Sequence, residues 1–177
     1  GKLMSQMGLQ SRQIKMHKYK HADNTHKIHG NLLNRNFSPT APNQVWTGGV
    51  TYIRIKGGWC YLAVVLDLYT RRIVGFAVSD SPDSVLTAKA LQMAYQTRLK
   101  PSGVLFHSDQ GTHYTSKTFA ESVVSCNGMT QSMSRRGNCW DNAPTERFFR
   151  SFKTEWIPKG GYENIDEAST AITDYIG

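Results

Sequence analysis

Five apolar runs bounded by turn residues recur along this chain and predict strands. They span residues 45–55, 59–68, 72–79, 104–108 and 129–133. The first three runs are separated by spacers as short as Gly57-Gly58, which predicts an antiparallel meander. Longer segments separate the last two runs from the meander and from each other, so these strands need right-handed crossovers.

Helical periodicity fills most of the spaces between these runs. Four helices are predicted, at residues 84–99, 116–126, 143–156 and 166–176. Asp83 is expected to cap the first helix, Asn142 the third and Asp166 the last. The expected buried stripes are Leu86, Ala90, Met93 and Ala94 in the first helix, Phe119 and Val123 in the second, and Phe149, Phe152 and Trp156 in the third.

This order of elements, β-β-β-α-β-α-β-α with one further helix, predicts an α/β domain. An antiparallel meander followed by alternating helices and strands gives a mixed five-stranded sheet with helices on both faces. The order is that of the ribonuclease H-like fold. We expect this domain to occupy residues 43–177.

Positive charge is concentrated before that domain. The 177 residues carry a net charge of +8, and residues 1–36 contain seven basic side chains against the single acid Asp23. A basic arm ahead of a nearly neutral body favours a polyanionic partner such as nucleic acid, although a solvated linker explains it equally well. Residues 1–10 are expected to be the end of a helix that stops at Gly8.

Several classes of protein are disfavoured by composition. The sequence has no apolar run near the ~20 residues of a membrane span and no signal-peptide pattern at its start. Its three cysteines, Cys60, Cys126 and Cys139, are odd in number and widely spaced. We therefore expect no disulfide framework, no membrane partner and a reducing, cytoplasmic location.

Two acids have positions suited to chemistry. Asp109 directly follows the run ending at Ser108, where open α/β sheets place ligands, although an Asx-turn or a helix cap is an equal alternative. Glu146 shares a helix face with Arg150 and Lys153 at i, i+4 and i+7. Surface ion pairing is the alternative there, and it contributes only ~0.3–0.5 kcal/mol.

Four segments of the chain carry a resemblance to a known family. They read VWTGGVTYI, YLAVVLDLYTRRIVG, FHSDQGTHYTS and QSMSRRGNCWDNAPTERFFRSFKTEW. Together they resemble the integrase core of insertion-sequence transposases, the DDE enzymes that are similar to retroviral integrases. The resemblance implies that residues 1–42 are a basic arm and the tail of a truncated DNA-binding region. It also implies that the core, residues 43–177, is truncated at its C-terminal end.

The resemblance assigns the catalytic acids residue by residue. Asp109 matches the second acid and Glu146 the third, and both would hold a pair of Mg²⁺ or Mn²⁺ ions. The first acid should stand three residues after Trp46, where this chain has Gly49. Asp67 on the neighbouring strand is the nearest substitute, but we expect it to have a structural task of its own.

Other residues are expected to meet DNA. By the resemblance, Arg150 and Lys153 would grip phosphates, and Arg135, Arg136 and Trp140 would contact the strand from a loop. A solvated loop with a buried Trp anchor is the alternative. His107 and His113 flank Asp109 and could orient its carboxylate or be purely structural. A zinc site on the histidines of the arm is disfavoured because the pattern lacks a C-x-x-C pair.

The implied function is DNA strand cleavage and transfer by a transposase catalytic domain of a mobile element, impaired because Gly49 replaces the first acid. The implied partners are DNA, as element ends and target, and further copies of the chain; no small-molecule substrate is expected. In a cell of bacterial type the protein would be nucleoid-associated when on DNA. Two alternatives stay open: a non-catalytic DNA-binding or regulatory remnant, and a cellular nuclease of the same fold.

Overall fold

The computed structural model describes residues 27–177, so the helix expected to end at Gly8 lies outside the described residues. Five strands form one sheet: β1 (Val45–Ile55), β2 (Gly58–Asp67), β3 (Arg72–Ser79), β4 (Leu105–Ser108) and β5 (Thr130–Met133). The helices are α3 (Ser84–Thr97), α4 (Thr112–Thr115), α5 (Lys117–Val124), α6 (Ala143–Glu155) and α7 (Ile165–Ile176), with a 3₁₀ turn η1 (Cys139–Asn142) before α6. None of these helices combines the length and apolar character that a membrane span requires.

The sheet is mixed, and its strand order is β3-β2-β1-β4-β5. β1, β2 and β3 pair antiparallel, with Trp46 opposite Asp67, and this confirms the predicted meander. β4 pairs parallel with β1, but only along Val45–Thr47. Beyond Thr47, β4 no longer pairs with β1, and an isolated bridge joins Ile55 to Tyr162.

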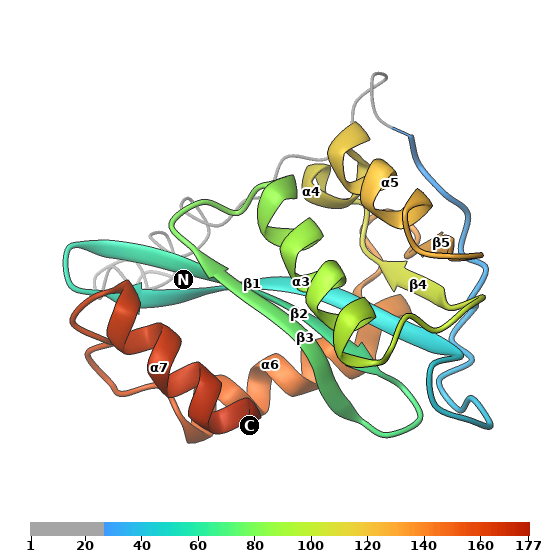
Figure 1. Cartoon of the computed structure of the whole chain (residues 1–177). Coiled ribbons are helices and arrows are strands. Elements are labelled where there is room, and N and C mark those ends of the chain that lie inside the picture. The colour runs from blue at the N-terminus through green and yellow to red at the C-terminus, as the bar shows by residue number, and fades with distance from the viewer. Residues whose placement is uncertain (1–26) are drawn as a thin grey trace.

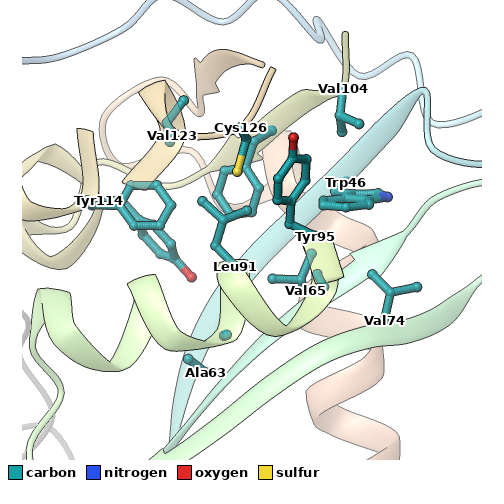
Figure 2. Packing of buried hydrophobic residues seen from close by; sticks show 14 of the residues in the cluster. Trp46, Ala63, Val65, Val74, Leu91, Tyr95, Val104, Tyr114, Val123 and Cys126 are labelled. Atoms are coloured by element: carbon teal, nitrogen blue, oxygen red, sulfur yellow. The ribbon is translucent and has the colours of Figure 1, made fainter. Parts of the chain in front are cut away.

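Helices cover both faces of the sheet, as predicted (Figure 1). On one face α3, α4 and α5 pack over Trp46, Ala63 and Val65. Figure 2 shows this cluster, which also contains Leu91 and Tyr114. On the other face α6 and α7 pack over a second cluster of β1 and β2 side chains that includes Ile53, Leu62 and Val64.

β2 explains why the sheet sits at the centre of the molecule. Its residues from Leu62 to Leu66 are all buried, and successive side chains enter opposite clusters. A continuous apolar run of this kind is typical of a strand covered on both faces. Leu62, Val64 and Leu66 are core residues of this strand, whereas Tyr61 is only partly buried.

The structure corrects the predicted burial of two helices. In α3, Met93 is 40% exposed, and Leu91 and Tyr95 are buried in its place. At the end of α6, Trp156 is 43% exposed, and its indole N–H donates to the carbonyl of Ala171. Both helices still bury most of the expected stripe: Leu86, Ala90 and Ala94 in α3, and Phe149 and Phe152 in α6.

Two of the predicted caps are also wrong. Asp83 does cap α3, with its carboxylate accepting from the Leu86 N–H at 3.1 Å. Asn164, not Asp166, caps α7 by accepting from the Glu167 N–H at 2.8 Å. Asn142 occupies the position before α6 without capping it: its amide nitrogen donates to the carbonyl of Gly48, and its Oδ1 accepts no hydrogen bond from the described residues.

Part of the predicted arm lies on the surface of the core. Leu33 is buried against Leu66 and Leu68, and its N–H donates to Ser132 Oγ at 3.0 Å. The Met133 N–H donates to the carbonyl of Gly30 at 3.0 Å. This segment follows β5 at the edge of the sheet, so the positive charge that it carries is held beside the core.

Gly75 on β3 allows α3 to approach the sheet closely. A Cβ at this position would lie 2.6 Å from the backbone nitrogen of Ala94 and would clash with the carbonyl oxygen of Ala90. Because the obstacle is helix backbone, Gly75→Ala is expected to lower the free energy of unfolding by about 2 kcal/mol through overpacking. Urea denaturation measures this loss. Gly58→Ala is the control, since open space surrounds Gly58, and an equal loss in both variants would contradict the packing explanation.

Candidate active site

Gly49, Asp109 and Glu146 line one pocket of about 490 Å³, together with Arg150 and Lys153. The topology explains why they converge. β4 separates from β1 after Thr47, so the residues that follow β4 open onto the part of β1 beyond Thr47. Ligand sites in open α/β sheets commonly form at such points, outside the carboxyl ends of the strands. α6 closes the pocket from the remaining side.

Asp109 is held in a tight local turn. Its Oδ1 accepts a hydrogen bond of 2.7 Å from the Gly111 N–H, two residues further along the chain. The Asx-turn that was the alternative explanation for this residue is therefore present. The turn orients the carboxylate at the end of β4, where it lines the pocket, so the structural and the chemical interpretations are compatible.

Glu146 lies in the first turn of α6, and the pKa of its carboxyl group is shifted. Burial raises the pKa of its carboxyl group, and the negative charge of Asp109 raises it further. The cations Lys153 and Arg150 oppose both effects. Burial in turn lowers the pKa of the Lys153 ammonium, against the pull of Glu146. Two acids and two cations thus share one pocket that is partly open to solvent, and the shifted pKa values of Glu146 and Lys153 are of the kind found at functional sites.

Gly49 faces α6 without room for a side chain. A Cβ there would lie 2.5 Å from Thr145 Cγ2 and 2.9 Å from Phe149 Cε2. Thr145 is fully buried, and its hydroxyl donates to Thr47 Oγ1 at 2.7 Å. The space that a first acid would enter is therefore filled by α6 itself.

Asp67 does not take the place of the missing acid. It lies opposite Trp46 at the far end of β1, away from the residues that line the pocket. Its buried carboxylate accepts from the N–H groups of Asn43 and Tyr69 and lies 3.5 Å from the Arg98 guanidinium. The expectation that Asp67 has its own structural task is confirmed.

The loop before α6 is held by a carboxylate that the sequence analysis passed over. Asp141 is fully buried, and it accepts two side-chain hydrogen bonds of 2.9 Å from Arg135 and one of 2.8 Å from Arg35. The Arg135 guanidinium, expected on DNA, is thus engaged within the protein. Arg136 is exposed, and Trp140, with 69% of its surface exposed, is not the buried anchor of the alternative reading.

The two histidines beside Asp109 are buried. His107 contacts the Ser132 hydroxyl through Nδ1, and its Nε2 lies 2.8 Å from the Asp141 carbonyl oxygen. Burial lowers the pKa of His107, so the neutral ring is the stable form. His107 therefore ties β4 and β5 to the loop before α6, which is a structural role. Burial also lowers the pKa of His113, while the charge of Asp109 raises it.

The chain matches known family models and known proteins. Two models, both described as the integrase core domain, match residues 39–139 and 127–177. The chain belongs to the integrase core domain family. The resemblance stated from the four sequence segments is thereby confirmed.

Individual relatives of this integrase core are longer than the chain. The transposase of insertion sequence IS904 from Lactococcus lactis is 39% identical over 178 residues, covering 99% of this chain and 70% of the relative. An uncharacterized protein of insertion element IS600 from Shigella sonnei is 43% identical over 146 residues, or 82% of this chain and 53% of the relative. The chain thus spans only about half the length of some of its relatives.

A solved structure supports the fold. The integrase catalytic core domain of HTLV-2, determined in complex with magnesium, aligns with a TM-score of 0.53 at 22% identity. The alignment covers 65% of this chain and 70% of that one. The mixed sheet and its helices are therefore those of a ribonuclease H-like integrase core, as predicted.

Proposed function

We propose that this integrase core binds DNA and carries the remnant of a strand-cleavage and strand-transfer site whose chemistry is impaired. One observation supports this: Asp109 and Glu146 face a single pocket with Arg150 and Lys153, and Gly49 lines the same pocket without a carboxylate. The acids would supply the chemistry, and the cations would hold the phosphates on either side of the reacting bond.

The pocket fits one divalent cation better than two. Asp109 and Glu146 would hold one Mg²⁺ or Mn²⁺ ion, which commonly uses one or two protein carboxylates. Such an ion would polarise a phosphate oxygen and activate an attacking hydroxyl. Among residues 27–177, however, no three His, Cys, Asp or Glu side chains form a metal-binding group. A metal pair needs a shared third acid, and Gly49 does not provide one.

The two cations of α6, Lys153 and Arg150, would bind DNA phosphates. Lys153 extends into the pocket beside Glu146, and Arg150 is exposed one turn before it. Both would hold the DNA backbone while Arg136 and Trp140 contact it from the loop before α6. Arg135 would act differently from the expectation, because it holds Asp141 and so keeps that loop in position.

The expected partners are DNA, as element ends and target, and further copies of the chain on that DNA. A regulatory remnant that binds DNA without cutting it is the second candidate. The close contact of Thr145 and Phe149 with Gly49 favours it, because the space for the first acid is closed.

DNA binding by the purified chain tests the proposal. We expect fluorescence anisotropy with a labelled duplex to show affinity that falls steeply with salt. Arg150→Gln and Lys153→Gln should each reduce the slope of log affinity against log salt by about one, because each removes one phosphate contact. Lys89→Gln, an exposed position on α3, is the matched control.

Two outcomes would count against the proposal. If all three variants lost affinity equally, the pocket cations would not be the DNA contacts. Cleavage of branched or hybrid substrates in Mn²⁺ without any strand joining would instead favour a cellular nuclease.

A further inference from the structure

A row of aromatic and cationic side chains leaves the pocket along the β1–β2 hairpin. The Lys153 ammonium lies 3.7 Å from the centroid of the Tyr52 ring. Tyr52 meets Trp59 edge to face, with ring centroids 5.2 Å apart, and the Arg54 guanidinium lies 5.9 Å from the centroid of Trp59. We refer to Lys153, Tyr52, Trp59 and Arg54 as the aromatic row.

Strand register explains why these side chains lie together. Arg54 is paired with Trp59 across the hairpin, and Tyr52 shares its face of β1 because alternate residues point the same way. The intervening residues Ile53 and Ile55 point to the opposite face, where they pack in the cluster that α7 covers. In Figure 1 the end of the hairpin projects beyond α3. The aromatic row therefore lies on the face of the hairpin that α7 does not cover.

The row is continuous with the candidate active site. Tyr52 and Lys153 both line the pocket that contains Asp109 and Glu146. Trp59 and Tyr52 are partly exposed, and Arg54 is exposed. Lys56, at the turn, adds a further cation, although it lies 3.9 Å from Glu163. The surface thus offers aromatic rings between positive charges, starting at the pocket wall.

We propose that the aromatic row binds unpaired nucleotides of a DNA strand whose phosphate lies in the pocket. Bases have π-faces that stack on aromatic side chains whatever their sequence, and neighbouring cations attract the backbone between them. A duplex would not use the row in this way, since its bases are already stacked on one another. This inference rests on the proposed function, because it extends the path of the same strand.

Binding of single-stranded DNA tests the row directly. A fluorescein-labelled oligothymidylate and a duplex of the same length are titrated with the full 177-residue chain. Trp59→Ala is expected to weaken binding of the single strand about tenfold and binding of the duplex much less, because one stacking surface is lost. Trp59→Phe, which keeps a ring, should restore most of the affinity. Tyr69→Ala removes an exposed aromatic side chain on the turn after β2 and should change neither affinity.

Photo-crosslinking of the unaltered chain does not depend on how any variant folds. An oligonucleotide with 5-bromodeoxyuridine is irradiated on the protein, and the crosslinked peptides are mapped by mass spectrometry. Crosslinks to Tyr52 or Trp59 support the proposal.

Two results would overturn the role of the aromatic row in binding and leave the proposed function standing. One is crosslinks confined to other surfaces. The other is equal single-strand affinity in Trp59→Ala and the unaltered chain. Failure to bind either DNA would overturn both.

Discussion

Replacing Asp141 with alanine is expected to lower the free energy of unfolding by about 3 kcal/mol, because it removes a buried carboxylate that two arginines share. Arg35 comes from the segment before the core and Arg135 from the loop before α6, and both donate to this carboxylate. Their guanidinium groups are roughly half exposed, so water compensates part of the lost interaction. We therefore expect a loss at the lower end of the range for a broken buried pair. Chemical denaturation measures it.

The pH dependence of Asp141→Asn separates charge from packing. Hydrogen bonds from Arg135 are the main cause that holds the pKa of Asp141 well below its usual range. A depressed folded-state pKa gives stability that is present above the unfolded value, near pH 4, and lost as pH falls below it. The asparagine variant has no such group to titrate. Its stability should therefore approach that of the unaltered chain at low pH.

Other groups also titrate on acidification, but they do so in both proteins. Burial lowers the pKa of His107, so its stabilising contribution too is lost as pH falls below about 6.5. The difference between the two proteins reports Asp141 together with its effect on His107, because the charge of Asp141 raises the pKa of that ring. A difference that stayed constant from pH 7 to pH 3 would show that the carboxylate charge is not what holds the loop.

The strands could be predicted because their signal is local. Apolar runs with Val, Ile, Trp and Tyr mark β1 and β2, and the Lys56-Gly57 turn between them needs a residue with positive φ, which Gly57 supplies at +82°. The helix stripes were harder to place, since the close approach of α3 to Gly75 decides which side chains of α3 are buried. α4 has only four residues, too few for any periodicity to appear.

The residues of the candidate site also divide into those with a local sequence signal and those whose role depends on distant contacts. Asp109 and Glu146 could be found because each follows a recognisable local element, the end of a strand and the start of a helix. Asp141 could not be understood in this way, because its partner Arg35 lies 106 positions away. The aromatic row depends on the register between β1 and β2, which places Trp59 beside Arg54. The space at Gly49 depends on where α6 packs, and no local pattern records that.

Restoring an acid at position 49 is expected to raise Mn²⁺ affinity on the order of 100-fold, the upper end of what the loss of an outer-shell contact usually costs. A third carboxylate would join Asp109 and Glu146 in the pocket. Gly49→Asp alone should fall short of this gain, because its Cβ meets Thr145 Cγ2 at 2.5 Å. Thr145→Ser removes that methyl group and keeps the hydroxyl that donates to Thr47. The double variant removes the shorter of the two contacts and leaves the Phe149 ring, 2.9 Å from the Cβ, to shift, so it is a better test than Gly49→Asp alone.

Isothermal titration calorimetry with Mn²⁺ compares the chain, Thr145→Ser alone and the double variant. Thr145→Ser alone should bind as weakly as the unaltered chain, because it adds no ligand. Adding Asp109→Asn to the double variant should abolish the gain, which places the ion in this pocket. The double variant should also nick DNA in Mn²⁺ faster than the unaltered chain. Equal Mn²⁺ binding by the unaltered chain, Thr145→Ser and the double variant would show that position 49 is not where the site lost its ligand.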